Sequence, residues 1–307
     1  MKKITINQRI YPNILRKIKN PPSVLYTEGN LELLKSNSIA IIGSRQASEN
    51  GKKFAKKFAS ELSSTGLTIV SGLARGIDTV AHTYSYNQTG KTIAVLGSGF
   101  NNIFPPENED LYKKILQNDG LVISEYSPDT EPLSEHFPVR NRIISGLSIG
   151  ILVIEAKHRS GTSKTAEFAT KQHKPVFVLP HSIDDPHGIG TNRLLKKGAI
   201  PITDASDILD NLKLSEFKEI YEKLKASENA DSNISIDKID VKNSFKARQN
   251  FPDPKQAKIF KLIKEKPITP NDLARKMNFS INEIQSILFI LEMDGYIKKV
   301  QGGYICM

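Results

Sequence analysis

Short apolar runs alternate with amphipathic stretches from residue 38 to about residue 203. The runs are rich in β-branched side chains and almost continuously apolar, which is typical of strands buried on both faces of a parallel sheet. The stretches between them, such as KKFAKKFASELSSTG (52–66), carry apolar positions at helical spacing. The predicted strands lie in SIAIIG (38–43), LTIVSG (67–72), TIAVLGSG (92–99), GLVISE (120–125), GILVIEA (150–156), PVFVLP (175–180) and AIPIT (199–203). This alternation predicts an α/β fold built on a doubly wound parallel sheet with right-handed crossovers.

The pattern changes after residue 210. Residues 211–254 begin as a charged helix and continue as a polar stretch with few apolar positions, which indicates a linker that is at least partly disordered. Residues 255–307 show three helical segments, the second and third capped by Thr269 and Ser280, and then a hairpin. Three helices and a hairpin predict a small winged-helix domain. The expected organisation is a short basic segment (1–20), the α/β domain (21–210), the linker (211–254) and the winged-helix-like domain (255–307).

The net charge of +10 is concentrated toward the two ends of the chain. Residues 1–20 contain six Lys or Arg and no acid, and residues 255–307 contain nine basic against five acidic residues. Residues 21–210 contain 20 of each sign, which cancel. An anion site in the α/β domain must therefore come from local clustering of cations and backbone N–H groups.

The composition and the residue patterns argue against disulfides, metal sites, a membrane span and a secretory signal. The single cysteine, Cys306, excludes an internal disulfide framework, and the six histidines form no HxxxH or HExxH pair, so a metal site has no support. The longest apolar run, 143–156, is interrupted by Ser and Gly and is too short to cross a bilayer. The basic N-terminus lacks the continuous apolar region of a secretory signal. We therefore expect a cytoplasmic protein with no membrane partner, metal or cofactor.

Polar loops that contain glycine follow five of the predicted strands. In open α/β sheets, ligands bind beyond the carboxyl ends of the strands, where such loops lead into helix N-termini. Gly43 allows a ligand to approach the backbone, Ser44 offers a hydroxyl group, and Arg45 offers a guanidinium group suited to phosphate. Residues 160–163 place small hydroxyl side chains at a helix start, a typical anion-binding arrangement, and Lys164 lies beside them. Together these loops predict an extended anion-binding surface.

The string HFPVRNRIISGLS (136–148) opens a helix at the same edge, with Pro138 in its first turn. Arg140 and Arg142 lie about 200° apart around such a helix. One of them is therefore expected to face a ligand, while the other pairs with an acid or the backbone. Phe137, an aromatic residue beside guanidinium groups, either stacks on a base or packs as a staple at the helix entry.

Three polar residues between 71 and 82 have interpretations of their own. Asp78 in SGLARGID is expected to cap or brace backbone N–H groups rather than act chemically. Arg75 either reaches a phosphate or faces solvent. His82 is expected to be a packed or capping residue.

At these residues the chain resembles the bacterial DNA-processing protein A (DprA/Smf) family. The matching strings include GSR (43–45), SGLARGIDTVAH (71–82), HFPVRNRIISGLS (136–148), SGTSKTAEFA (160–169) and GTNRLLKKGA (190–199). They follow the family's order and spacing over about residues 11–210. A C-terminal winged helix also occurs in many members.

The resemblance implies an extended Rossmann-like domain that binds single-stranded DNA and forms a homodimer. It also implies loading of the RecA recombinase onto incoming strands in natural transformation, a role without catalytic turnover and therefore without catalytic residues. Carried over by motif, the DNA-binding residues are Gly43, Ser44, Arg45, Phe137, Arg140, Asn141, Ser160, Gly161 and Lys164.

The sequence departs from the family pattern in three places. Pro180-His181-Ser182 stands where Pro-Gly-Ser is common, and Thr162-Ser163 occupy the last two positions of the usual SGSL turn. With about 20 residues before the core, we also expect no N-terminal helical domain of the kind that some members carry.

Two alternative functions are open at this point. Phosphoribohydrolases of related fold use a Gly-Gly-x-Gly-Thr loop with a nearby Glu, which Gly161-Thr162 and Glu167 match in part. The glycine pair is missing, however, and Glu167 lies on the second turn of its helix, away from a ligand at the helix start.

A winged-helix transcription regulator is the second alternative. Its recognition helix would be SINEIQSILFILEMDG (280–295), which has no Lys or Arg and three acids, and these would repel DNA phosphates. Its apolar face is more simply explained as core, formed by Ile281, Ile284, Ile287, Leu288 and Leu291.

Overall fold

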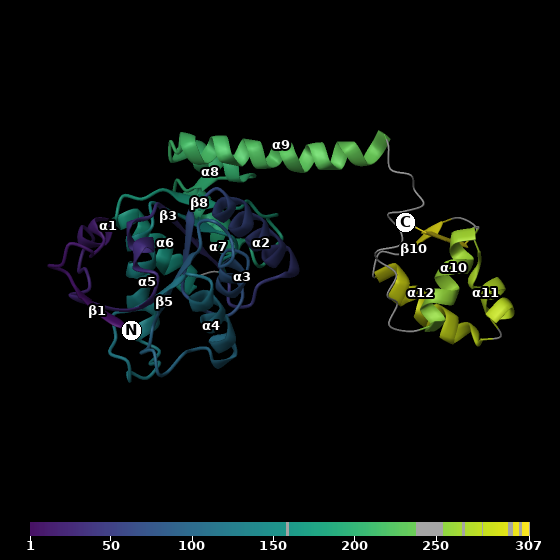
Figure 1. Ribbon diagram of the computed structural model, residues 1–307, viewed down its shortest axis with the longest axis horizontal. Helices are drawn as coiled ribbons and strands as arrows, with labels where there is room; N and C mark the ends of the chain where they lie inside the picture. The colour runs from purple at the N-terminus through teal and green to yellow at the C-terminus, as the bar shows by residue number, and fades with distance from the viewer. Residues whose placement is uncertain are drawn as a thin grey trace. The chain divides into compact units, whose positions relative to one another are not determined.

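The computed structural model describes residues 1–157, 160–237, 254–265, 268–277, 279–293, 297–300 and 303–306. The chain divides into two compact units, Met1–Glu228 and Asn229–Met307, and each is described by itself. In Figure 1 the first unit is a sheet covered by helices, and the second is a small group of helices with a short sheet.

The first unit contains a nine-stranded sheet in the order β1-β2-β6-β5-β4-β3-β7-β8-β9. Its strands are β1 (Lys2–Thr5), β2 (Val24–Gly29), β3 (Ser38–Ile42), β4 (Thr68–Ser71), β5 (Thr92–Leu96), β6 (Leu121–Ser124), β7 (Gly150–Val153), β8 (Val176–Val178) and β9 (Ile200–Pro201). From β3 onward neighbouring strands pair in parallel. The chain runs outward from β3 to β6 and then crosses back to β7 on the other side of β3, so the topology switches direction between β3 and β7.

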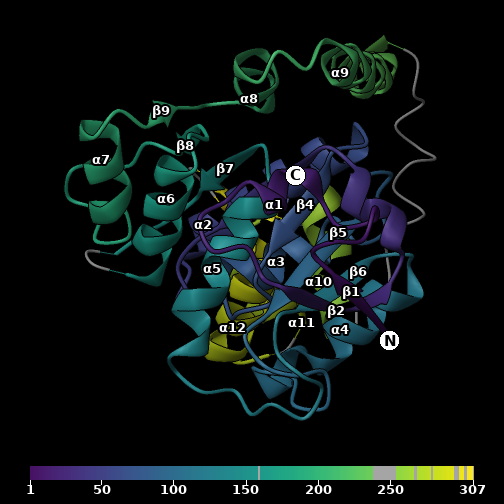
Figure 2. The same cartoon turned by 90° about the vertical axis from the view of Figure 1, so that its left-hand side faces the viewer.

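Helices cover both faces of this sheet (Figure 2). They are α1 (Asn13–Arg16), η1 (Leu31–Lys35), α2 (Glu49–Ser64), α3 (Ile77–Thr83), η2 (Pro106–Asn108), α4 (Glu109–Gln117), α5 (His136–Leu147), α6 (Gly161–Lys171), α7 (Ile189–Lys196), α8 (Ala205–Asn211) and α9 (Ser215–Asp237). Alternate side chains of one strand enter different cores: Ala40 and Ile42 of β3 pack with α5 and α6, whereas Ile39 and Ile41 pack with α2 and α3. Burial on both faces explains why the central strands are continuously apolar, and the predicted doubly wound α/β fold is confirmed.

Two strands near the N-terminus were not predicted from the sequence. β1 pairs antiparallel with β2, and β2 pairs antiparallel with β6, so one edge of the otherwise parallel sheet is antiparallel. The segment 1–20, which the sequence analysis set apart from the α/β domain, supplies β1 and the buried side chains Tyr11, Leu15 and Ile18. Only Ile4 of β1 is buried, so this strand carries too weak an apolar pattern to be recognised.

The first unit continues past residue 210 through α8 and the start of α9. Tyr221 of α9 is buried in the same core as residues of α2, and its hydroxyl group donates a hydrogen bond to Asp204 Oδ1 at 2.9 Å. The expected linker 211–254 therefore begins as a helix that is packed on the first unit. Its residues 238–253 lie outside the described part of the chain.

Beyond α9, the described residues of the second unit form three helices followed by a two-stranded antiparallel sheet, as predicted for a winged helix. They are α10 (Pro254–Glu265), α11 (Pro270–Met277), α12 (Ile281–Met293), β10 (Ile297–Val300) and β11 (Gly303–Cys306). Thr269 and Ser280 accept hydrogen bonds from the backbone N–H groups of Asp272 and Glu283, which confirms both predicted N-caps. The apolar face of α12 is buried at Ile284, Ile287, Leu288 and Leu291, whereas Ile281 is exposed.

Across the described residues, no helix combines the length and apolar character needed to cross a membrane.

Candidate functional site

A cavity of about 850 Å³ opens at the carboxyl ends of β3 and β7, where the topology switches direction. The loops after these two strands and after β4 line it, together with Phe104, the segment before α5 and residues of α5 and α6. All nine residues carried over from the family motifs line it: Gly43, Ser44, Arg45, Phe137, Arg140, Asn141, Ser160, Gly161 and Lys164. Their DNA contacts stay a prediction, but the fold brings together side chains that are up to 121 positions apart in the sequence.

Phe137 lies close to two guanidinium groups in the cavity wall. The Cζ atoms of Arg45 and Arg140 are 5.6 Å and 5.9 Å from the centre of its ring, within the range of cation–π attraction. The ring also packs against Phe104, with 5.4 Å between the ring centroids. A Cβ atom on Gly97 would come within 2.7 Å of Phe137, so this ring requires glycine at position 97.

Arg45 and Arg140 differ in exposure and in their hydrogen bonds to the protein. Arg45 is exposed, whereas Arg140 is only 3% exposed and donates hydrogen bonds from Nη1 to the carbonyl oxygens of Gly72 (2.6 Å) and Val95. Burial lowers the pKa of Arg140 to about 10, so it still carries its positive charge at neutral pH. Its buried Nε–H group has no hydrogen-bond acceptor among the described residues. Arg140 therefore places a fixed positive charge at the floor of the cavity.

Asp78 braces the loop beneath Arg140. Its Oδ2 atom accepts a hydrogen bond from the backbone N–H of Gly72 at 3.1 Å, which confirms the expected structural role. Burial raises the pKa of Asp78, and the positive charge of Arg140 opposes that shift. A Cβ atom on Gly72 would lie 2.8 Å from the Arg140 guanidinium group, so glycine is needed for this close approach.

Arg142 faces away from the cavity lining and pairs with Glu125. Its Nε–H group also donates to the backbone carbonyl of Asn20 at 3.0 Å. Arg75 does line the cavity, but it forms an exposed ion pair with Glu107. Arg140 is thus the arginine of α5 on the cavity side, while Arg142 ties α5 to the N-terminal segment.

Hydrogen bonds join α6 to the loop after β3 and to α5. Thr162 donates from its hydroxyl group to the carbonyl oxygen of Gly43 at 2.9 Å, and Asn141 Nδ2 lies 3.4 Å from the carbonyl oxygen of Gly161. Ser160 is the N-cap of α6 and accepts from the backbone N–H of Ser163. With the exposed Lys164, this helix start gives the cavity an anion-binding wall.

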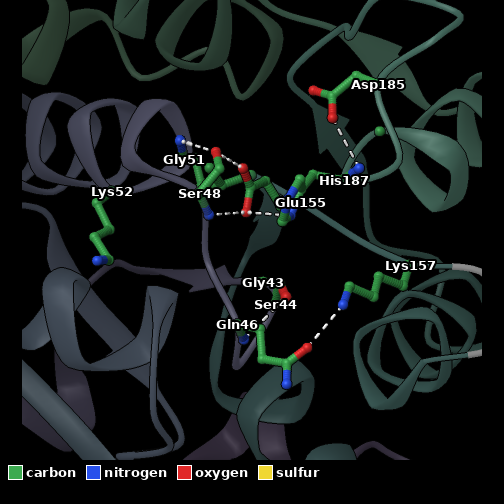
Figure 3. Close-up of polar contacts among 12 residues, drawn as sticks. Gly43, Ser44, Gln46, Ser48, Gly51, Lys52, Glu155, Lys157, Asp185 and His187 are labelled. Atoms are coloured by element: carbon green, nitrogen blue, oxygen red, sulfur yellow. Dashed lines mark hydrogen bonds and ion pairs between the residues drawn. The ribbon is translucent and has the colours of Figure 1, made fainter.

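A buried carboxylate behind the cavity holds the loop that carries Arg45 (Figure 3). Glu155 is fully buried and accepts hydrogen bonds from the hydroxyl group and the backbone N–H of Ser48, the N-cap of α2. The Ser48 oxygen accepts in turn from the backbone N–H of Gly51 at 2.9 Å. His187 Nδ1 lies 3.7 Å from Glu155 Oε2. This role of Glu155 was not predicted, although an acid at the end of a buried strand is a signal that the sequence contains.

A second link joins the two loops closer to the cavity. Lys157 Nζ donates to Gln46 Oε1 at 2.8 Å, and both residues line the cavity (Figure 3). The loops after β3 and β7 are therefore fastened to each other at two levels, one buried and one exposed.

The partial phosphoribohydrolase pattern is not assembled at this cavity. Gly161 and Thr162 line it, but Glu167 lies in a different depression, as expected from its place on the second turn of α6. In the described part of the chain, no group of three or more His, Cys, Asp or Glu residues could hold a metal ion.

Comparison with known proteins gives consistent matches along the chain. The family model for DNA recombination-mediator protein A matches residues 2–213, and the model for the DprA winged helix domain matches residues 246–303. Protein Smf of Escherichia coli is 38% identical over 304 residues, covering 98% of this chain and 76% of the relative. The DNA processing protein DprA of Streptococcus pneumoniae is 45% identical over 199 residues, covering 65% and 70%.

Two solved structures share the fold of the first unit. DNA processing protein A from Streptococcus pneumoniae aligns with a TM-score of 0.65 and 43% identity, covering 68% of this chain and 73% of the other. DNA processing protein A from Helicobacter pylori, described with a single-stranded DNA binding mode, aligns with a TM-score of 0.63 and 33% identity, covering 70% and 97%. The chain belongs to the DprA/Smf family of DNA-processing proteins.

Proposed function

We propose that this protein binds single-stranded DNA in the cavity, with phosphates held by Arg45, Lys164 and the start of α6. The observation that carries the proposal is the arrangement around Phe137, an aromatic ring with two guanidinium groups within 6 Å of its centre, in a cavity that a helix N-terminus also lines. An aromatic surface accepts any base, and cationic groups hold the backbone. The single-stranded DNA binding described for the Helicobacter pylori relative supports the same assignment.

Binding of this kind is stoichiometric and largely independent of base sequence, because the cationic groups address phosphate rather than base edges. We further propose that the protein acts without catalytic turnover in the cytoplasm, as a homodimer that presents two cavities. In this proposal it protects incoming strands and loads a RecA-type recombinase onto them. Light scattering would test the dimer, and recombinase filament formation on single-stranded DNA would test the loading.

Fluorescence anisotropy of labelled oligo-dT, compared with a duplex of equal length, tests the binding site directly. We expect the wild type to prefer the single strand and Arg45→Ala to weaken binding about tenfold or more, with an affinity that falls as salt rises. Arg9→Ala is the matched control, because Arg9 is exposed and does not line the cavity.

Two results would contradict this assignment. If the protein binds the duplex as tightly as the single strand or more tightly, and Arg45→Ala leaves that binding unchanged, DNA binding would be assigned to the winged helix or the basic N-terminus instead. Absence of any DNA binding would favour nucleotide hydrolysis, which an assay of nucleoside monophosphate cleavage with wild type and Glu167→Gln would then examine.

A further inference from the structure

A second depression, here called the α6–α7 groove, lies between helices α6 and α7 and has a volume of about 600 Å³. Figure 2 shows these two helices side by side at one end of the sheet. The polar part of the lining consists mainly of Glu167, Lys171, Lys174, Arg193 and Lys197. Four cationic side chains against one carboxylate give the groove a net positive charge, although residues 21–210 as a whole are neutral.

Lys174 is the most enclosed cation of the α6–α7 groove. Its Nζ atom donates to the carbonyl oxygens of Ser145 (2.6 Å) and Gly146 (2.8 Å). An ammonium group has three N–H donors, so the third is not used by these two bonds. Burial lowers its pKa to about 8, and it forms no ion pair with an acid among the described residues. A phosphate oxygen in the groove would supply the missing counter-charge.

Helix α6 is a wall shared by the cavity and the α6–α7 groove. Thr162 and Lys164 line the cavity, whereas Ser163, Glu167 and Lys171 line the groove. The helix rises about 1.5 Å per residue, so its length from Gly161 to Lys171 is about 15 Å, a distance that a few nucleotides cover. A strand that leaves the cavity past Lys164 therefore meets a second cationic surface along the same helix.

We propose that the α6–α7 groove binds backbone phosphates of the single strand that leaves the cavity. The inference rests on the proposed function and extends it, since it gives the bound strand a direction along α6. Lys174 forms the inner contact, and the exposed Lys171 and Lys197 form the outer contacts. These contacts depend on charge and carry no information about base sequence.

The test compares two oligo-dT lengths, one long enough only for the cavity and one that also reaches the groove. The double variant Lys171→Ala/Lys197→Ala should bind the short oligo like the wild type and the long oligo roughly tenfold more weakly at low salt. The slope of log affinity against log salt for the long oligo should fall by about 1.4, because each phosphate contact with a single strand contributes about 0.7. Lys53→Ala/Lys56→Ala on α2 is the matched control, since these exposed lysines carry the same charge and do not line the groove.

The outcomes separate this inference from the proposed function. Arg45→Ala should weaken the binding of both oligo lengths. If Arg45→Ala loses binding and the double variant binds both lengths like the wild type, the cavity binds DNA and the proposal for the groove is wrong. Equal weakening of both lengths in the double variant would also overturn it. Equal affinity of the wild type for both lengths, with binding of inorganic phosphate that the double variant lacks, would overturn it too, because the groove would then hold free phosphate.

Discussion

His82 shows how strongly burial sets the chemistry of a single residue in this protein. The backbone N–H of Leu73 donates to its Nε2 atom at 3.3 Å, so Nδ1 carries the proton and donates to the hydroxyl group of Thr92 at 2.8 Å. The ring is thus neutral and fully buried, which confirms that His82 is a packed residue. Burial, followed by the charge of Arg140, lowers its pKa to about 3.

This pKa predicts that acid destabilises the fold through His82. The unfolded chain holds one more proton than the native chain between pH 6.5 and about 3, so the free energy of unfolding falls as the pH falls through that window. The contribution reaches about 1.4 kcal/mol per pH unit. Urea unfolding from pH 7 to pH 5 should show a smaller pH slope for His82→Gln than for wild type, while His173→Asn, at an exposed position, should keep the wild-type slope. An unchanged slope in His82→Gln would contradict this assignment.

At the residue scale, helical spacing was enough to predict that Arg140 and Arg142 lie on different sides of their helix, but not which of them faces the cavity. That choice depends on which side of α5 packs on the sheet, because Arg140 reaches backbone carbonyls at the ends of β4 and β5. Spacing along one helix contains no information on those distant carbonyls. The hydrogen bonds of Arg140 were therefore not predictable, whereas its place in the cavity lining followed from the motif.

At the scale of elements, burial decided which strands could be recognised. Strands β3 to β7 are buried at every position, and their apolar runs predicted them. At the antiparallel edge, β1 has one buried position and β2 alternates between buried and more exposed positions, and both strands were missed. Sequence distance limited the prediction of the site. Ser48 and Glu155 are 107 positions apart, and they meet only because β3 pairs with β7.

The contact between Ser48 and Glu155 leads to a prediction about the loop that carries Arg45. Ser48→Ala removes an N-cap and leaves a buried carboxylate with fewer donors, so we expect a loss of about 1–3 kcal/mol in unfolding free energy. The affinity for single-stranded DNA should also fall several-fold, because the loop after β3 loses one of its hydrogen bonds to the loop after β7. Thr269→Ala is the control: it removes an N-cap in the second unit and should leave DNA affinity unchanged. Equal affinities in both variants would show that this contact does not position Arg45.

At the scale of the whole molecule, the chain consists of two units with separate cores. Among the described residues, the core of the second unit is built from α10, α11, α12, β10 and Ile268. The cores of the first unit contain described residues up to Tyr221. The sequence predicted this division, because the apolar pattern stops and then resumes. It did not predict that α9 would begin within the first unit, since one buried tyrosine in a charged helix is a weak signal.

Two separate cores predict that the first unit keeps its fold and its DNA binding without the second. A chain that ends at Asp237 retains every residue of the cavity and of the α6–α7 groove. We expect its affinity for oligo-dT to stay within about threefold of the full chain, since the cationic groups that hold phosphate are all present. Anisotropy and circular dichroism would check binding and fold together. A folded product that has lost affinity would assign part of the binding to the second unit.

The reversal of direction between β3 and β7 has a consequence for protein synthesis. The wall that contains Arg45 is translated early, whereas the wall that contains Lys164 follows more than a hundred residues later. A chain that has emerged from the ribosome only as far as β6 contains the loop with Arg45 but not α6, which lines the other side of the cavity. The anion-binding enclosure therefore closes only after the second half of the sheet has been made and has docked beside β3.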